Sequence, residues 1–170
     1  LPVSVPLVGE NLGACDTLAL IIDTVREAGL PPGSLDLLVS EPSLLNPHPA
    51  TSDAVAALRD AGFTFTLLDF GAQTISLQWL SRLGPDRLKI HRPFVRAVAS
   101  DPARMALARS VIALAQTLRI AAIADGIASD SDAQFFKWEG CELGQGDALA
   151  PACALADVAE HLQHGSRTPH

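Results

Sequence analysis

The chain has 170 residues, of which 48% are apolar and 18% are charged, so it can bury a core and does not have the composition of a disordered polymer. The formal net charge of −7 at pH 7 argues against general electrostatic binding to a nucleic acid polymer. The sequence has neither a membrane-spanning apolar run nor the basic start of a signal peptide, and we expect a cytoplasmic domain, alone or cut from a larger membrane-associated parent.

Short apolar runs alternate with helical patterns along the chain. Gly29, Gly62 and Gly140 each follow a helical pattern and predict its end, whereas Ser52 and Asp101 predict helix starts. The predicted strands cover residues 3–8, 35–39, 63–68, 87–90, 120–124 and 141–143. The predicted helices cover residues 11–28, 53–61, 75–83, a long stretch from 102, 130–139 and 155–163.

These elements form six successive strand-then-helix units. The strands are continuous apolar runs, which is typical of a parallel sheet buried on both faces. The pattern therefore predicts an α/β domain with either a doubly wound sheet or a barrel. We expect one domain over residues 1–164 and a loose tail over 165–170. The core stripe predicted for the long helix is Leu107, Val111, Leu114 and Leu118.

The three cysteines are Cys15, Cys141 and Cys153. Their number is odd, and no two of them form a CxxC pair. We interpret them as free thiols of a reducing compartment rather than as a disulfide framework or a zinc site.

Five polar residues end or follow separate predicted strands. Each has an ordinary structural explanation, such as a solvated strand end, a turn residue, a lysine that snorkels out of the sheet or a loop amide. In a (β/α) barrel, however, the carboxyl edge of the strands is where sites are built. Together the five predict one shared site, either working or vestigial: Glu41, Asp69, Lys89, Asp125 and Gln145.

Several segments carry a family resemblance in the right order. The segments LPVSVPLV and LDLLVSEPSLL resemble the family patterns "vsvNlS" and "leleiTEs.ll". The segments LLDFGAQTISLQWL, RLKIHRPFV and IAAIADGIAS, with the later GQGDALAPA, resemble "lDDFGtGysSl.yL", "lKiDrsFv", "v.vvAEGVEt" and "QGyl...p". The chain thus resembles the EAL domain, which binds and usually hydrolyses cyclic di-GMP. The resemblance implies a TIM-type (β/α) barrel, here with about six units and the first units missing.

The resemblance also assigns roles to the strand-end residues. In that family, acidic side chains hold two divalent metals that clamp the phosphodiester and activate a water molecule. Glu41 and Asp69 match metal ligands, and Asp125 stands where the family has the Glu of "AEG". Lys89 matches the lysine that steers the water, and Gln145 matches the Gln of "QGyl".

Other positions depart from the family pattern. Pro6 replaces a metal-binding Asn, and Leu68 replaces the Asp that bridges the two metals. His91 and Ala128 replace two further acidic residues, and the EAL segment itself is absent because the chain begins after it. We therefore predict no binuclear centre. Weak binding of a single Mg²⁺ or Ca²⁺ ion is the most that Glu41 and Asp69, with Asp125, would support.

These departures predict a catalytically inactive EAL-like domain that acts as a regulatory or protein-interaction module. The alternative is a receptor that binds cyclic di-GMP without hydrolysing it, and a remote alternative is an active phosphodiesterase. An unrelated activity on the same scaffold is also compatible, because a fold does not set a function.

An opened barrel would expose strand edges and apolar surface. We expect the chain to associate with itself or with a protein partner through its open N-terminal edge, the alternative being a monomer with a shielded edge. A receptor needs basic groups near the pocket, for which the candidates are Arg87, Lys89 and Arg92. An interaction module needs an apolar surface patch, for which the candidates are Trp79, Phe135, Phe136 and Trp138. Of the last three, at least one ring should face the core.

Overall fold

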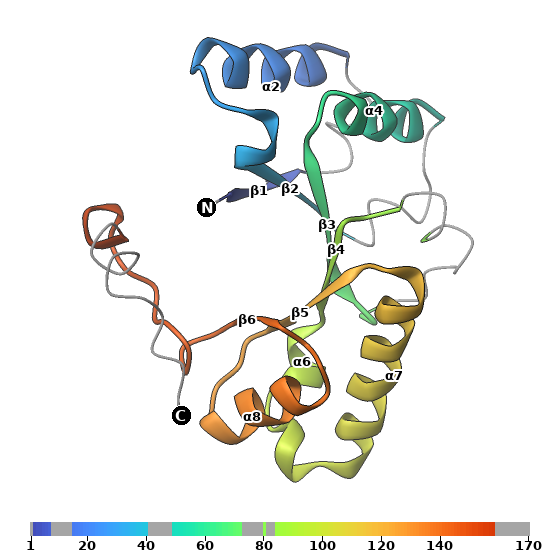
Figure 1. Cartoon of the computed structure of the whole chain (residues 1–170), viewed down its shortest axis with the longest axis vertical. Helices are drawn as coiled ribbons and strands as arrows, with labels where there is room; N and C mark the ends of the chain where they lie inside the picture. Colours follow the sequence, from blue (N-terminus) through green and yellow to red (C-terminus); the bar gives the residue numbers. More distant parts are fainter. Residues whose placement is uncertain (1, 8–14, 41–48, 73–79, 81–83, 159–170) are drawn as a thin grey trace. The chain divides into compact units, whose positions relative to one another are not determined.

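The computed structural model describes residues 2–7, 15–40, 49–72, 80 and 84–158. Six strands form one sheet, and their order in the sheet is their order in the chain (Figure 1). The strands are β1 (Val3–Leu7), β2 (Leu35–Ser40), β3 (Thr64–Phe70), β4 (Arg87–Ile90), β5 (Ala121–Asp125) and β6 (Leu143–Gln145).

The sheet is of the barrel type rather than the doubly wound type. The pairs β1–β2, β2–β3 and β5–β6 are all parallel. A doubly wound sheet reverses its strand order at a switch point, and no reversal occurs among these six strands. The predicted α/β class is therefore confirmed, and the strand order fits an incomplete (β/α) barrel.

Helices connect the strands. They are α2 (Cys15–Glu27), α4 (Pro49–Asp60), α6 (Arg92–Val95), α7 (Pro102–Leu118) and α8 (Asp130–Trp138), with 3₁₀ turns η1 (Pro32–Ser34) and η2 (Val98–Ser100). No helix among the described residues is long and apolar enough to cross a membrane. The chain divides into two compact units, residues 1–89 with 118–120 and residues 90–117 with 121–170.

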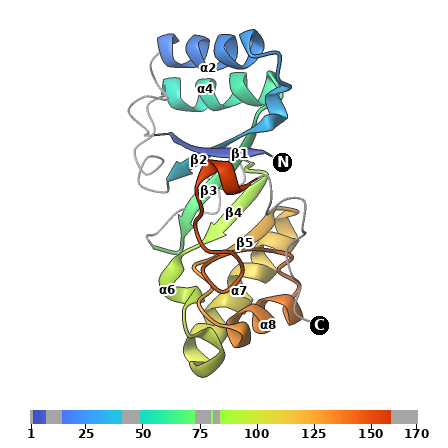
Figure 2. The ribbon, with the colours of Figure 1, turned by 90° about the vertical axis from the view of Figure 1, so that its left-hand side faces the viewer.

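The first unit has an apolar core on one face of its strands. Leu37 and Val39 of β2 and Phe65 and Leu67 of β3 are fully buried and alternate with more polar positions, so they share that face. Helices α2 and α4 lie side by side in both views (Figures 1 and 2). Leu58 of α4 is also fully buried.

A buried carboxylate lies among the alternate positions of the same strands. Asp36 of β2 is 3% exposed and accepts hydrogen bonds from the hydroxyls of Ser4 at 3.0 Å and Thr66 at 2.9 Å. A guanidinium nitrogen of Arg87 lies 3.4 Å from the Asp36 carboxylate. Arg87 was a predicted basic group of a ligand pocket, but it forms an ion pair with Asp36. The sequence analysis did not identify this network, although an Asp inside an apolar strand was a signal for it.

Helix α7 buries a different stripe from the predicted one. Ala108, Ile112 and Ala115 are buried, whereas Leu107 is 47% exposed and Leu118 is 36% exposed. The buried stripe lies one position further along the chain than predicted, a rotation of about 100° around the helix, while Val111 and Leu114 of the predicted stripe are half-buried. Both stripes are apolar in sequence, so the sequence pattern alone did not distinguish them.

Other helix starts and strand bounds follow from local chemistry. Asp101 caps α7 as predicted, because its carboxylate accepts from the amides of Ala103 at 2.9 Å and Arg104 at 3.2 Å. Ser52 is not a cap, because α4 begins earlier, at Pro49, a residue well suited to a first helical turn.

Strand β6 covers residues 143–145, whereas the sequence predicted a strand over 141–143. Of the helices predicted over 75–83 and 155–163, only residue 80 and residues 155–158 are described, and these are helical.

The rings and thiols divide between core and surface. Phe135 and Phe136 are buried and meet edge to face, whereas Trp138 is 78% exposed, so the prediction that at least one ring faces the core is confirmed. Trp79 lies outside the described residues.

Cys141 is buried and Cys153 is exposed, and both are free thiols, as predicted. The side chain of Cys15 is not described.

Candidate functional site

The predicted site residues fall on two units. Asp69 near the end of β3 and Lys89 in β4 belong to the first unit. Asp125 at the end of β5 and Gln145 at the end of β6 belong to the second. Glu41 lies outside the described residues. Each of the four described residues therefore lies at or near the carboxyl end of its strand.

In the first unit, the end of β3 turns sharply. Asp69 is exposed and has a φ of +54°, a left-handed conformation that Asp tolerates better than most residues. The preceding residue, Leu68, is in register with Ser40 of β2 and is half-buried. Its side chain presents only hydrocarbon. Lys89 is half-buried on β4.

In the second unit, two of the predicted residues are direct neighbours. Asp125 and Gln145 are partners in the parallel register of β5 and β6. The carbonyl of Gln145 accepts hydrogen bonds from the amides of Gly126 at 2.8 Å and Ile127 at 3.0 Å. A Cβ on Gly146 would lie 2.4 Å from the Ile127 nitrogen, so only glycine allows this close backbone approach. The chain leaving β5 is thereby held against β6.

An arginine lies beside the Asp125 carboxylate. A terminal nitrogen of Arg92 is 3.8 Å from Oδ1 of Asp125, and the Arg92 side chain is 52% exposed. The same Oδ1 is buried and has no hydrogen-bond partner among the described residues. Gly126 makes room for the arginine, because a Cβ there would lie 2.5 Å from Arg92 Cγ. The sequence analysis named both residues but did not connect them.

Two positions of the described chain lack the oxygen ligands that a binuclear metal centre needs. Such a centre needs several oxygen ligands around two ions, and among the described side chains no three of His, Cys, Asp or Glu gather closely enough to hold even one. Pro6 and Leu68 offer no side-chain oxygen at the positions where the resemblance expects ligands.

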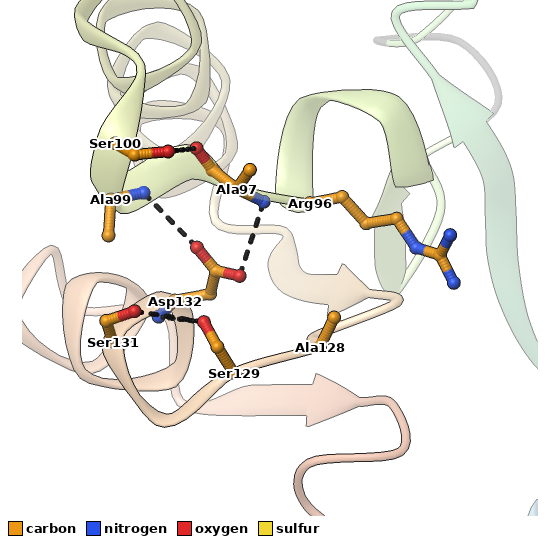
Figure 3. A pocket seen from close by; sticks show the side chains of 8 residues that line it. All are labelled: Arg96, Ala97, Ala99, Ser100, Ala128, Ser129, Ser131 and Asp132. Carbon is orange, nitrogen blue, oxygen red and sulfur yellow. Dashed lines mark hydrogen bonds between the residues drawn. The ribbon is translucent and has the colours of Figure 1, made fainter.

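A shallow cavity of about 590 Å³ lies in the second unit, between segments 96–100 and 128–132 (Figure 3). Asp132 lines it and is 2% exposed. Its carboxylate accepts from the amides of Ala97 and Ala99, and Ser129 caps α8 by accepting from the Asp132 amide (Figure 3). Since both oxygens of Asp132 have partners, its role here is structural. The sequence analysis did not single out Asp132, although the spacing of Ser129 and Asp132 resembles a capping box.

Comparisons with known proteins give one consistent result. The EAL domain family matches residues 1–152. The cyclic di-GMP phosphodiesterase NbdA of Pseudomonas aeruginosa is 31% identical over 96% of this chain. The blue light- and temperature-regulated antirepressor BluF of Escherichia coli is 26% identical over 81% of it.

A solved structure extends the likeness to the fold. The EAL domain of Mycobacterium smegmatis DcpA matches 99% of this chain and 75% of that chain, with a TM-score of 0.92 and 26% identity. The chain spans about a fifth of the length of NbdA and about a third of BluF, since the covered shares are 21% and 34%.

Proposed function

The chain belongs to the EAL domain family, and we propose that it is a catalytically inactive member that acts as a regulatory or protein-interaction module in bacterial cyclic di-GMP signalling. The observation that carries this proposal is Leu68, which stands where the resemblance places the carboxylate that bridges two metals.

The chemistry of the site explains the proposed loss of activity. Two-metal hydrolysis stabilises the attacking and leaving oxygens between two ions, and a bridging carboxylate sets the separation of those ions. Leucine cannot bind an ion, and Pro6 removes a second oxygen ligand on β1. We propose that the strand-end residues are vestigial, with Glu41, Asp69 and Asp125 as former metal positions and Lys89 and Gln145 as former catalytic ones.

The direct test is an assay of cyclic di-GMP turnover by the purified chain with Mg²⁺ or Mn²⁺. We expect no linear or mononucleotide product. The variant Leu68→Asp should also be inactive, because Pro6 and Ala128 still lack oxygen ligands. Metal-stimulated product formation that Asp69→Asn abolishes would overturn the proposal. Circular dichroism of each variant shows whether its fold is retained.

A non-hydrolysing receptor is the second candidate. The observation that favours it is the guanidinium of Arg92, which is half exposed at the end of β5 and offers a cationic contact for phosphate. Calorimetry with cyclic di-GMP in the presence of chelator distinguishes the candidates. Heat of binding that Arg92→Gln weakens supports a receptor, whereas the absence of heat supports an interaction module.

We also propose that the chain associates through β1. All five residues of this strand are exposed or half-buried, and Val3 is 63% exposed. Pro6 lacks an amide hydrogen, so side-chain packing rather than a continuous hydrogen-bond ladder would hold the contact. Light scattering should give a mass that rises with concentration and falls in Val3→Lys. A constant monomer mass contradicts this proposal.

A further inference from the structure

Helix α7 buries one apolar stripe and leaves a second one largely outside. This outer stripe consists of Leu107, Val111, Leu114 and Leu118. Leu107 is 47% exposed, whereas Val111 and Leu114 are half-buried. Along the chain the four residues alternate steps of four and three positions, which is the spacing of the seam between two packed helices. The outer stripe therefore has the pattern of a helix-packing surface.

A row of small side chains runs beside the outer stripe. Its members are all exposed: Ala103, Ala106, Ser110, Ala113 and Thr117. The hydroxyls of Ser110 and Thr117 donate to carbonyls of the preceding helical turn at 2.9 Å and 2.8 Å. These hydroxyls have acceptors without water, so covering the row leaves no polar side chain unsatisfied. Small side chains also let another helix approach closely.

Neither row carries a charged residue. The charged residues of α7 are Arg104 and Arg109. Arg104 forms an ion pair with Asp101 at 3.0 Å, and Arg109 forms one with Glu139 at 2.8 Å. Both guanidiniums therefore have anionic partners within the second unit, and the outer stripe and the small row form a neutral surface.

We propose that α7 packs against α7 of a second copy of this chain. In a two-fold contact both partners present the same surface, so that surface must carry a ridge and also the groove that receives it. Here the large side chains of one helix lie over the small row of the other, the arrangement by which packed layers interdigitate.

Charge also favours this surface for self-association. Each chain has a net charge of −7, so two copies repel one another where their acidic residues face each other. The neutral rows of α7 avoid that repulsion. A helix of 17 residues is only about 25 Å long, so the contact is small and we expect a dimer that dissociates on dilution. This inference goes beyond the proposed function, because it needs neither the loss of catalysis nor a contact through β1.

The test is analytical ultracentrifugation of the full chain in a Val3→Lys background, which removes the contact proposed through β1. We expect a mass that rises with concentration towards that of a dimer. Adding Leu107→Glu should give a monomer, because dimerisation would bury a carboxylate among apolar side chains. The matched control Gln116→Glu adds the same charge at an exposed position on the opposite side of α7, and it should dimerise like its parent. Circular dichroism shows whether each variant keeps its fold.

Cross-linking locates the contact independently. A two-fold axis across antiparallel helices brings their midpoints together, and Ser110 is the middle residue of α7. Ser110→Cys, with Cys15→Ser and Cys153→Ser, should therefore form a disulfide-linked dimer under mild oxidation, whereas Gln116→Cys in the same background should not.

Three results overturn the inference. They are a constant monomer mass in the Val3→Lys background, a Leu107→Glu protein that dimerises like its parent, and equal cross-linking at the two cysteine positions. The first of these would leave the contact through β1 standing if the wild-type protein still associates. Turnover of cyclic di-GMP by a protein that dimerises through α7 would contradict the proposed function alone and leave this inference standing.

Discussion

The carboxylate of Asp132, in the first turn of α8, accepts hydrogen bonds from the backbone amides of Ala97 at 3.3 Å and Ala99 at 3.2 Å. These amides belong to the short turn between α6 and α7. The Asp132 side chain is almost fully buried, and each of its two oxygens accepts one of these bonds. One side chain therefore fixes the position of α8 relative to the turn that follows Arg92 and its helix.

Replacing Asp132 should destabilise the second unit strongly. In Asp132→Ala the two amides lose a charged acceptor inside the protein, and we expect a loss of about 2–3 kcal/mol in the free energy of unfolding. Chemical denaturation gives this value directly. The control is Asp130→Ala in the same helical turn, whose exposed side chain should change stability by less than about 1 kcal/mol. Equal losses in the two variants would contradict the assignment.

The buried Asp36 network should make a similar contribution in the first unit. Asp36→Ala removes the acceptor for Ser4 and Thr66 and the partner of Arg87, so we expect a loss of about 2–3 kcal/mol. The hydroxyl of exposed Ser4 contributes one of these bonds, and Ser4→Ala should cost only about 1 kcal/mol or less. Urea unfolding of both variants checks this order. A Ser4→Ala loss as large as that of Asp36→Ala contradicts it.

The class of fold could be predicted from sequence because it rests on repetition. Each buried strand is a short apolar run, and each helix follows with a cap or a glycine stop, so errors in single elements do not change the pattern. Strand order along the chain then follows from the parallel connections. The orientation of α7 could not be predicted in this way, because apolar residues on adjacent stripes give the same signal.

The candidate site was only partly accessible from sequence. The sequence placed Asp125 and Gln145 at the ends of separate strands, and the structure shows that the two are register partners. The contact of Arg92 with Asp125 could not be derived, because it depends on how α6 packs against β5 and on the space that Gly126 leaves. Ion pairs between residues distant in sequence, such as Asp36 with Arg87, could not be predicted for the same reason.

Substitution of Ala97 by glycine should stabilise the protein. Its φ of +54° lies in the left-handed region, which costs an L-residue with a Cβ roughly 1 kcal/mol or more. Ala97→Gly should therefore raise the free energy of unfolding by about 0.5–1 kcal/mol, since glycine's greater freedom in the unfolded chain offsets part of the gain. The control Ala106→Gly, at an exposed position inside α7, should lower it by about 1 kcal/mol. Thermal unfolding of both measures the opposite signs, and a loss in Ala97→Gly would contradict the assigned strain.

The two described thiols should differ in reactivity with pH. Burial raises the pKa of the Cys141 thiol above its ordinary value, and its Sγ donates to the Ala122 carbonyl at 3.3 Å. A raised pKa means that less thiolate is present at a given pH, and the thiolate is the reactive form. At about pH 8, close to the ordinary pKa of a cysteine, exposed Cys153 should be alkylated well before Cys141. Labelling of Cys141 should accelerate only at higher pH, or in denaturant, where burial no longer opposes ionisation.

Mass spectrometry of the digested protein follows the labelling of each cysteine separately, and the variant Cys153→Ser confirms which labelled peptide is which. Equal rates for the two thiols in the native protein would show that the core around β5 and β6 opens more easily than the buried position of Cys141 implies.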